Sequence, residues 1–172
     1  MTEYGGWRMI YIALGANLPS SAGAPEATLR RVLALLPTRG VSVEAVSAFY
    51  QTPAWPNPAD PPYVNAVARV RTQLGPLDLM RALLQLETEF GRKRSAKNAP
   101  RTLDLDIVDY GGLVTDAAHL MLPHPAMHER AFVLKPLSDV APDWRHPVTG
   151  QRVSELMRIV GEDGLKPLET AG

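Results

Sequence analysis

The 172-residue chain contains no cysteine. This absence excludes disulfide cross-links, thiolate metal ligands and a cysteine nucleophile. No apolar run in the sequence approaches the roughly 20 residues that a membrane-spanning helix needs. Residues 1–8 also lack the basic start and apolar stretch of a secretion signal. We therefore expect a cytoplasmic protein that has no membrane partner.

The chain also has no net charge. Eighteen Lys and Arg balance eighteen Asp and Glu, so the formal charge is zero and gives no reason to expect nucleic acid as a partner. Two phosphate-binding patterns are absent, the G-x-x-x-x-G-K-[ST] loop and the G-x-G-x-x-G fingerprint. If the protein binds a nucleotide, it does so without a glycine-rich loop.

The residues that are present have the composition of a globular protein, with 45% hydrophobic and 21% charged residues. A chain of this length is large enough to bury one core, so we expect a single domain over residues 1–172 and a monomer. Met9 directly precedes the first apolar run. Residues 1–8 are therefore a candidate disordered extension of that domain.

Apolar periodicity predicts alternating strands and helices along most of the chain. The predicted strands cover 9–14, 41–50, 63–72 and 103–110, and the predicted helices run from Pro25 to Pro37 and from Pro76 to a C-cap at Gly91. The order βαββαβ is typical of a ferredoxin-like sheet with two helices on one face. Val153, Leu156, Met157 and Val160 have helical spacing and are expected to cover part of the second face. We therefore predict an α+β fold forming a three-layer α/β/α sandwich.

Between the second and third predicted strands lies a segment, residues 52–62, with five prolines in eleven residues. Proline at this density prevents a helix or a central strand, and a stiff loop of this length is often functional. In the strand that follows, Tyr63 and Asn65 project from the same side, opposite Val64 and Ala66, because side chains alternate along a strand. We expect Tyr63 and Asn65 on the sheet face that the first two helices leave free.

Asp104 and Asp106 are two positions apart in the last predicted strand, so their carboxylates share one face. Two adjacent negative charges repel unless a cation lies between them, and hard carboxylate oxygens suit Mg²⁺ bound together with phosphates. On spacing alone, a solvated strand face with two incidental acids explains the pattern better.

A basic segment immediately before this strand changes that interpretation. Five of the eighteen basic residues fall within ten positions, with no acid among them: Arg92, Lys93, Arg94, Lys97 and Arg101. Such a run is usually a solvated face. Cations that lead directly into a carboxylate pair, however, match the needs of polyphosphate transfer, in which metal bridges the phosphates and guanidinium groups bind their oxygens.

Two histidines add a second candidate metal site. His124 and His128 are four residues apart, and Pro125 is placed to open a short helix on which they would share a metal. One surface histidine and one packing or capping histidine explain the spacing equally well. Arg130 and Phe132 form a polar–aromatic patch that fits either a site wall or ordinary surface.

Several sequence blocks recur in the order of a known family. They are Ala13-Leu14-Gly15-Ala16-Asn17-Leu18, Phe49-Tyr50-Gln51-Thr52-Pro53, Tyr63-Val64-Asn65-Ala66, Glu87 with Gly91-Arg92, Pro100-Arg101-Thr102-Leu103-Asp104-Leu105-Asp106-Ile107, Leu122-Pro123-His124-Pro125 and Arg130-Ala131-Phe132-Val133-Leu134. From about residue 9 to residue 140, the chain resembles the 6-hydroxymethyl-7,8-dihydropterin pyrophosphokinases of folate biosynthesis. The resemblance implies transfer of pyrophosphate from ATP to the pterin hydroxymethyl group, with release of AMP.

The resemblance also implies roles for particular residues. Asp104 and Asp106 would hold two Mg²⁺ ions, and together with Arg92 and Arg101 they would form the catalytic set. The residues implied to bind ATP are Glu87, Arg92, Arg94, Arg101, Ile107, His124 and Arg130. The residues implied to bind the pterin are Thr52, Pro53, Trp55, Tyr63, Asn65 and Phe132, with backbone contacts at the first two. No residue is an obvious general base.

Two other functions remain open from the sequence. The first is a ferredoxin-like module that binds nucleotide or RNA through the loop from Arg92 to Arg101 without chemistry. The second is a metal-dependent phosphohydrolase that uses Asp104, Asp106 and His124 with His128. RNA binding insensitive to chelator would favour the first, and pterin-independent phosphate release would favour the second.

Overall fold

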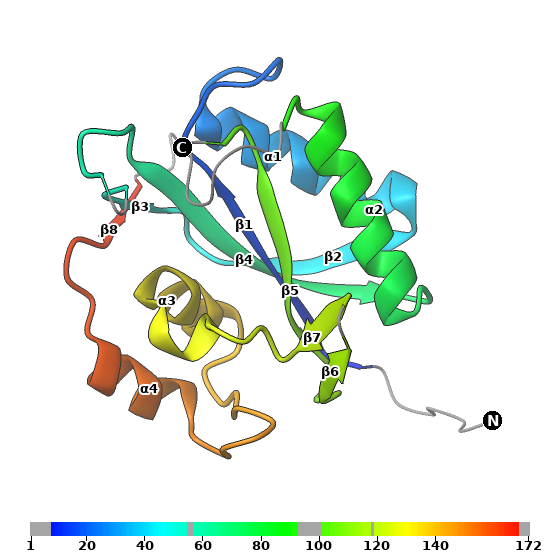
Figure 1. Ribbon diagram of the computed structural model, residues 1–172, viewed down its shortest axis with the longest axis vertical. Helices are drawn as coiled ribbons and strands as arrows, with labels where there is room; N and C mark the ends of the chain where they lie inside the picture. Colours follow the sequence, from blue (N-terminus) through cyan, green and yellow to red (C-terminus); the bar gives the residue numbers. More distant parts are fainter. Residues whose placement is uncertain (1–7, 55–56, 93–100, 118, 169–172) are drawn as a thin grey trace.

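The computed structural model of the chain describes residues 8–54, 57–92, 101–117 and 119–168. Within these residues the chain has the expected α+β fold, an antiparallel sheet with four α-helices (Figure 1). No helix in these ranges is both long and apolar enough to cross a membrane. The sequence-predicted site residues Trp55 and Arg94, and residues 1–7 of the candidate extension, lie outside the described residues.

The sheet is built around two neighbouring strands that both come from the first half of the chain. The strands are β1 (Ile10–Ala16), β2 (Val41–Val46), β3 (Tyr50–Thr52), β4 (Tyr63–Thr72), β5 (Asp104–Tyr110), β6 (Thr115–Ala117), β7 (Leu120–Leu122) and β8 (Lys166–Pro167). The α-helices are α1 (Pro25–Leu35), α2 (Pro76–Glu89), α3 (Ala131–Val140) and α4 (Val153–Val160). The strands pair in the order β5-β1-β4-β3-β8, β2 also pairs with β4, and β6 and β7 form a separate hairpin.

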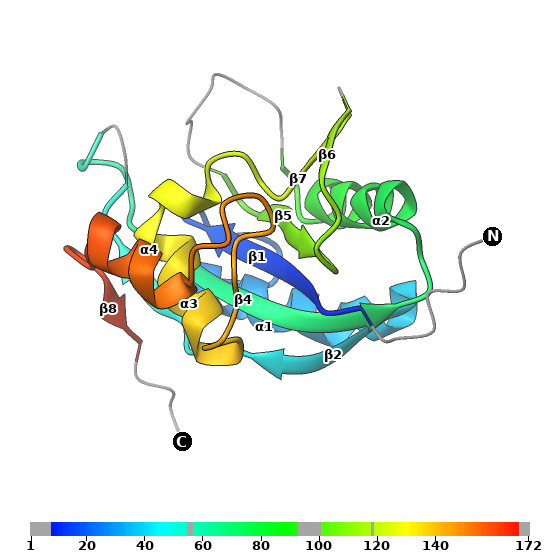
Figure 2. The same ribbon diagram turned by 90° about the horizontal axis from the view of Figure 1, so that it is seen from below.

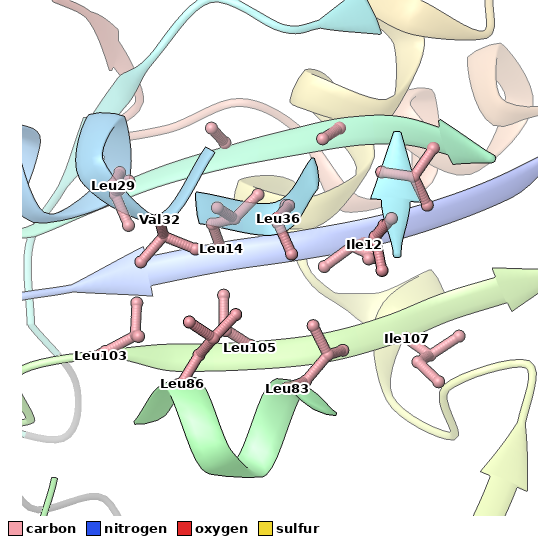
Figure 3. Close-up of a cluster of buried hydrophobic side chains, with 14 of the residues drawn as sticks. Ile12, Leu14, Leu29, Val32, Leu36, Leu83, Leu86, Leu103, Leu105 and Ile107 are labelled. Atoms are coloured by element: carbon pink, nitrogen blue, oxygen red, sulfur yellow. The ribbon is translucent and has the colours of Figure 1, made fainter. Parts of the chain in front are cut away.

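Alternation along the central strands divides the core into two apolar clusters. On one face, Ile12 and Leu14 of β1 pack with Leu83 and Leu86 of α2 and with residues of α1 (Figure 3). Each of these side chains is at most 1% exposed, and burying one contributes about 1.5–3 kcal/mol. The polar positions of β4 and β5 therefore point to the other face.

On that other face, Tyr11, Val67 and Val108 pack against Leu134 and other apolar residues of α3. α4 lies beside α3, and the two helices lie on the opposite side of the ribbon from α1 and α2 (Figures 1 and 2). The predicted helix built on Val153 and its neighbours is confirmed. Near the first residues of α3, this face of the sheet is open and forms a cleft.

The predicted strand over residues 41–50 is wrong in one respect, because the structure contains two strands there. β2 ends at Val46 and β3 begins at Tyr50. Between them the Ser47 hydroxyl accepts a hydrogen bond from the Val67 backbone N–H of β4 at 2.9 Å. The Ser47 backbone N–H still donates to the Val67 carbonyl at 2.9 Å, but its hydroxyl takes the place of its carbonyl as the acceptor for Val67. β2 and β3 therefore pair with different parts of β4.

Helix α3 was not predicted from the sequence. Val133, Leu134, Leu137 and Val140 have helical spacing and are buried, but Pro136 lies inside the helix. Proline lacks the backbone N–H that an interior helix position donates and therefore usually ends a helix. Here the apolar contacts of this helix with β4 and α4 override that local preference.

The end of α2 sets the position of the first arginine of the site. Gly91 has φ +84° and donates its N–H to the Thr88 carbonyl at 3.0 Å, and the Arg92 N–H donates to the Glu87 carbonyl at 3.0 Å. These two bonds form a Schellman motif and confirm the predicted C-cap. Because the turn is closed in this way, Arg92 leaves the helix directly beside the Glu87 side chain.

We predict that Gly91→Ala destabilises the protein by about 1 kcal/mol, because a Cβ is disfavoured in the left-handed region. Gly91→Asn should cost less, since asparagine tolerates this conformation. Urea unfolding monitored by circular dichroism measures both free energies. Equal stability of the alanine variant and the original chain would contradict this account of the turn.

Candidate functional site

A cleft lies on the uncovered part of the α3 face, between the central strands and the start of α3. It is lined by Ala13, Leu14, Gly15, Asn65, Asp104, Asp106, Val108, His124, Met127, Arg130, Phe132 and Val133. Gly15 is required by a close approach, because a Cβ there would lie 2.8 Å from the Asn65 side-chain oxygen. The cleft thus brings together residues that are far apart in the sequence, and both predicted carboxylates are among them.

The two carboxylates of β5 lie on the cleft side of the sheet. Leu105, between them, is buried in the opposite apolar cluster. Burial, together with the negative charges of Asp104 and Glu87, raises the pKa of Asp106 to about 7. A carboxylate pair whose shared negative charge is this unfavourable favours a bound cation, and its oxygen donors fit Mg²⁺.

Two arginines bracket Asp104. Nη1 of Arg92 lies 3.0 Å from Asp104 Oδ1, and Nη1 of Arg101 lies 3.2 Å from Asp104 Oδ2. Both guanidinium groups are mostly buried, each 21% exposed, so screening by water is weaker than at the surface. The carboxylate thus holds two cationic groups at the edge of the cleft, where they are placed to bind anionic oxygens.

Glu87 lies beneath Arg92 and is 4% exposed. Its Oε2 accepts hydrogen bonds from Arg92 Nη1 at 2.6 Å and from the Leu105 backbone N–H at 2.8 Å. Burial raises the pKa of Glu87, while the Leu105 N–H and the Arg92 charge lower it. The structure therefore places Glu87 where it covers the free edge of β5 and orients Arg92.

The nucleotide contact predicted for Ile107 stays a prediction, and the side chain of this residue points away from the cleft. Ile107 is 2% exposed and packs in the apolar cluster on the face of α1 and α2 (Figure 3). The reason is the two-residue period of the strand, which turns Ile107 away from the face of Asp106. Its side chain belongs to the core.

His124 and Arg130 close the cleft opposite the carboxylates. The Ala126 backbone N–H donates to His124 Nδ1 at 3.2 Å, so the proton of the neutral ring is on Nε2. Burial lowers the pKa of His124, and the nearby Arg130 charge lowers it further. At neutral pH this histidine is therefore a hydrogen-bond donor rather than a cation, and Arg130 supplies the positive charge.

The predicted ring-binding residues are partly gathered in the same cleft. Asn65 is 7% exposed, and its Nδ2 donates to the Thr52 hydroxyl at 3.1 Å. Phe132 is 36% exposed and lies under the Arg130 guanidinium, 5.6 Å from ring centroid to carbon. Tyr63 pairs with Thr52 but does not line the cleft. Pro53 is exposed at the end of β3.

The histidine pair does not form a metal site. His128 is absent from the cleft lining and packs edge-on against His146, with ring centroids 5.7 Å apart. The short helix covers residues 127–129 and is a 3₁₀ helix, so it does not begin at Pro125 as predicted. Among the described residues, no group of three or more His, Cys, Asp or Glu side chains could hold a metal ion.

One residue of this region received no role from the sequence. Asn17, directly after β1, is 2% exposed. Its Oδ1 accepts from the Arg101 backbone N–H at 2.8 Å, and its Nδ2 donates to the Pro61 carbonyl at 3.1 Å. The signal available in the sequence was weak, a polar residue at the end of a buried strand.

An α+β sheet that gathers paired carboxylates and arginines in one cleft has the features of metal-dependent phosphoryl-transfer enzymes. Comparison with known sequences gives the family within this class. The family model 7,8-dihydro-6-hydroxymethylpterin-pyrophosphokinase (HPPK) matches residues 11–142. The chain therefore belongs to the HPPK family, the pyrophosphokinases of folate biosynthesis.

Relatives from distant organisms support this assignment. A 2-amino-4-hydroxy-6-hydroxymethyldihydropteridine pyrophosphokinase of Pseudomonas aeruginosa is 43% identical over 163 residues, which are 94% of this chain and 98% of that protein. A protein of the same name from Synechocystis is 42% identical over 121 residues, 70% of this chain and 62% of the relative. The folic acid synthesis protein fol1 of Pneumocystis carinii is 35% identical over 92% of this chain, which spans only 21% of that protein.

Solved structures support the fold. A triple mutant of Plasmodium falciparum HPPK-DHPS with pteroate superposes with a TM-score of 0.72 and 13% sequence identity. The match covers 96% of this chain and 47% of that chain, so the present sequence spans about half of the structure. At this identity the likeness shows the shared fold alone.

Proposed function

We propose that this chain transfers pyrophosphate from ATP to the hydroxymethyl oxygen of 6-hydroxymethyl-7,8-dihydropterin and releases AMP. The observation that carries the proposal is a single cleft in which Asp104 and Asp106 face Asn65 and Phe132. Groups suited to a metal-bound polyphosphate thus lie beside groups suited to a flat, hydrogen-bonding ring. Membership of the HPPK family supports the same reaction.

The charged half of the cleft would bind ATP. Asp104 and Asp106 would hold Mg²⁺, for which we propose two ions, and the metal would supply neutralisation of the triphosphate charge. Arg92 and Arg101 contact Asp104 in this structure and would extend to phosphate oxygens when ATP is present. Stabilising charge that spreads over these oxygens lowers the barrier to transfer.

Three other residues complete this half of the site. His124 would donate a hydrogen bond to phosphate from its protonated nitrogen, and Arg130 would add a second cationic contact. Glu87 would act by orienting Arg92, with which it shares a 2.6 Å contact. Arg94 stays a predicted nucleotide contact outside the described residues.

The less charged half of the cleft would bind the pterin. Asn65 would offer its Oδ1 acceptor and the Nδ2 hydrogen that Thr52 does not use to the mixed hydrogen-bonding edge of the ring. Phe132 and Tyr63 would pack on the ring faces, and the backbone at Thr52 and Pro53 would contribute polar contacts. Trp55 remains a predicted packing residue. Placing the hydroxymethyl group next to the β-phosphorus converts a bimolecular reaction into an oriented one.

We also infer that the helices and sheet form a ferredoxin-like core within a three-layer α/β/α sandwich. The pairing of β5, β1, β4 and β2, together with separate apolar clusters on the two faces, supports this arrangement. A single domain over residues 1–172 that functions as a monomer remains our proposal. Gel filtration with light scattering tests the oligomeric state.

Phe132→Ala should raise the KM for the pterin about tenfold, because an aromatic contact with the ring contributes on the order of 1 kcal/mol or more. The KM for ATP should change little. The side chain is 36% exposed, so the melting temperature should also stay close to that of the original chain. Steady-state kinetics with each substrate varied in turn provide the measurement. An unchanged pterin KM would remove Phe132 from the proposed pterin site.

The proposed activity is tested by incubating the protein with ATP, Mg²⁺ and the hydroxymethyl-dihydropterin and separating the nucleotides by chromatography. AMP should form only when the pterin is present and should cease when EDTA is added. Formation of ADP, or no nucleotide product, would contradict the proposal. Phosphate release without pterin would instead indicate a phosphohydrolase, and RNA binding insensitive to EDTA would indicate a binding module.

A further inference from the structure

Asn17 connects two chain segments that lead into different parts of the proposed site. Its side chain is 2% exposed, which is unusual for a polar residue unless its hydrogen bonds are satisfied. Its Oδ1 and its backbone N–H bind the backbone of Arg101, at 2.8 Å to the N–H and 3.1 Å to the carbonyl. Its Nδ2 binds the Pro61 carbonyl at 3.1 Å.

Each connected segment leads directly into residues of the proposed site. Pro61 is two residues before Tyr63, where β4 begins and the proposed pterin-binding positions follow. Arg101 is three residues before Asp104, to which its guanidinium reaches. Pro61 is 44 and Arg101 is 84 positions from Asn17 in the sequence. One buried amide therefore joins two distant segments across the end of β1.

We propose that Asn17 is a positioning residue that fixes the pterin-binding segment relative to the phosphate-binding Arg101. This proposal rests on the function proposed above. An amide is suited to the task because it offers an acceptor and a donor on one rigid group. The bond to Arg101 holds the base of the arginine beside Asp104, and the bond to Pro61 holds the loop that precedes Tyr63. In-line transfer depends on this spacing, since small displacements of reacting groups slow a reaction steeply.

The two bonds can be separated by substitution. In Asn17→Ala both are lost, and we expect kcat to fall about 10- to 100-fold, as for a modest displacement of a catalytic group. In Asn17→Asp one oxygen still accepts from the Arg101 N–H, whereas the second faces the Pro61 carbonyl without a proton to share. Because only the contact with the pterin segment breaks, we expect the pterin KM to rise about fivefold with a smaller loss of kcat.

Tyr110→Phe serves as the matched control. Tyr110 is 6% exposed and its hydroxyl donates to the Leu74 carbonyl at 2.6 Å, at the end of β5 remote from Asp104. The variant therefore loses one buried hydrogen bond outside the cleft. Its kcat and both KM values should match those of the original chain, measured at a temperature where circular dichroism shows every variant folded.

The proposal is overturned if Asn17→Ala retains kcat within twofold, if Asn17→Asp leaves the pterin KM unchanged, or if Tyr110→Phe shows the same losses. A failure of the proposed function would look different, because the original chain itself would then give no pterin-dependent AMP. Activity in the original chain combined with normal kinetics in the Asn17 variants refutes the positioning role alone.

Discussion

Asp106→Asn should lower kcat by 10³-fold or more while it stabilises the metal-free protein. The loss of activity follows from removing half of the proposed metal-binding pair, since metal neutralisation of a triphosphate contributes several kcal/mol to the transition state. The gain in stability follows from the raised pKa of Asp106, about 7 instead of 3.8, which shows that burial and neighbouring acids disfavour its ionised form. An amide has nearly the same shape and no charge.

The sign of the pH dependence is fixed by these two pKa values. Between pH 3.8 and about 7 the folded state holds a proton on Asp106 that the unfolded state has lost. Stability therefore falls as pH rises through this window and stays low above it. In EDTA, the advantage of Asp106→Asn over the original chain should be up to about 4 kcal/mol at pH 8 and should nearly vanish by pH 4.

Asp116→Asn provides the matched control, because Asp116 is exposed on β6. This variant should keep full activity, and its unfolding free energy should stay within about 0.5 kcal/mol of the original. Urea unfolding at both pH values measures the stabilities. Equal stability of Asp106→Asn and the original chain at pH 8, or retention of more than a tenth of the activity, would contradict the assignment of Asp106.

Arg92→Met should lower both activity and stability. Removing one preorganised donor from a site of developing negative charge typically costs 10²–10³-fold in kcat. The same change leaves the Glu87 carboxylate, which is 4% exposed, bonded to the Leu105 N–H without the balancing charge of Arg92. Breaking a buried pair in this way costs about 3 kcal/mol, because one charge stays buried without its partner.

A second substitution separates the two effects. In Glu87→Gln combined with Arg92→Met, the amide oxygen still accepts from Leu105 and no buried charge remains, so most of the lost stability should return. Activity should not return, because the guanidinium is still absent. Arg39→Met is the comparison at an exposed pair, where Arg39 lies 2.6 Å from Glu89 and the two side chains are 27% and 48% exposed, and it should cost no more than about 1 kcal/mol.

Denaturant unfolding and steady-state kinetics on the original chain and the three variants provide the measurements. A double variant as active as the original chain would show that Arg92 serves only to balance Glu87. An Arg92→Met variant as stable as the original chain would show that the buried charge of Glu87 does not need Arg92 to balance it. Either result would contradict the position that the structure gives to this pair.

The strands that build the site could be predicted because they follow simple periodic patterns. The predicted strand over residues 63–72 has the bounds of β4, and alternation placed Asn65, Asp104 and Asp106 on the correct face. Gly91 was predicted as a C-cap because only glycine readily adopts its backbone conformation. These features depend on neighbours within a few positions, which the sequence displays directly.

The features that could not be predicted depend on contacts between distant segments. Helix α3 was not predicted because Pro136 lies inside it, and proline normally ends a helix. The helix forms because its packing on the sheet outweighs the local cost of this proline. The break between β2 and β3 was not predicted either, because it depends on the hydrogen bond between Ser47 and Val67, two residues that are distant in the sequence. The role proposed for Asn17 requires knowing that Pro61 and Arg101 meet at the end of β1. Periodicity assigns a face to a side chain and does not identify such partners.

The central claim is tested most directly by following the β-phosphate of ATP. The protein is incubated with Mg²⁺, the hydroxymethyl-dihydropterin and ATP labelled with ³²P at the β position. The products are separated by chromatography, the label is located among them, and their masses are measured by mass spectrometry. The account predicts that the label moves to the pterin, which gains two phosphate groups, and that AMP forms in equal amount. Label retained in ADP with a singly phosphorylated pterin, or label released without pterin, would contradict it.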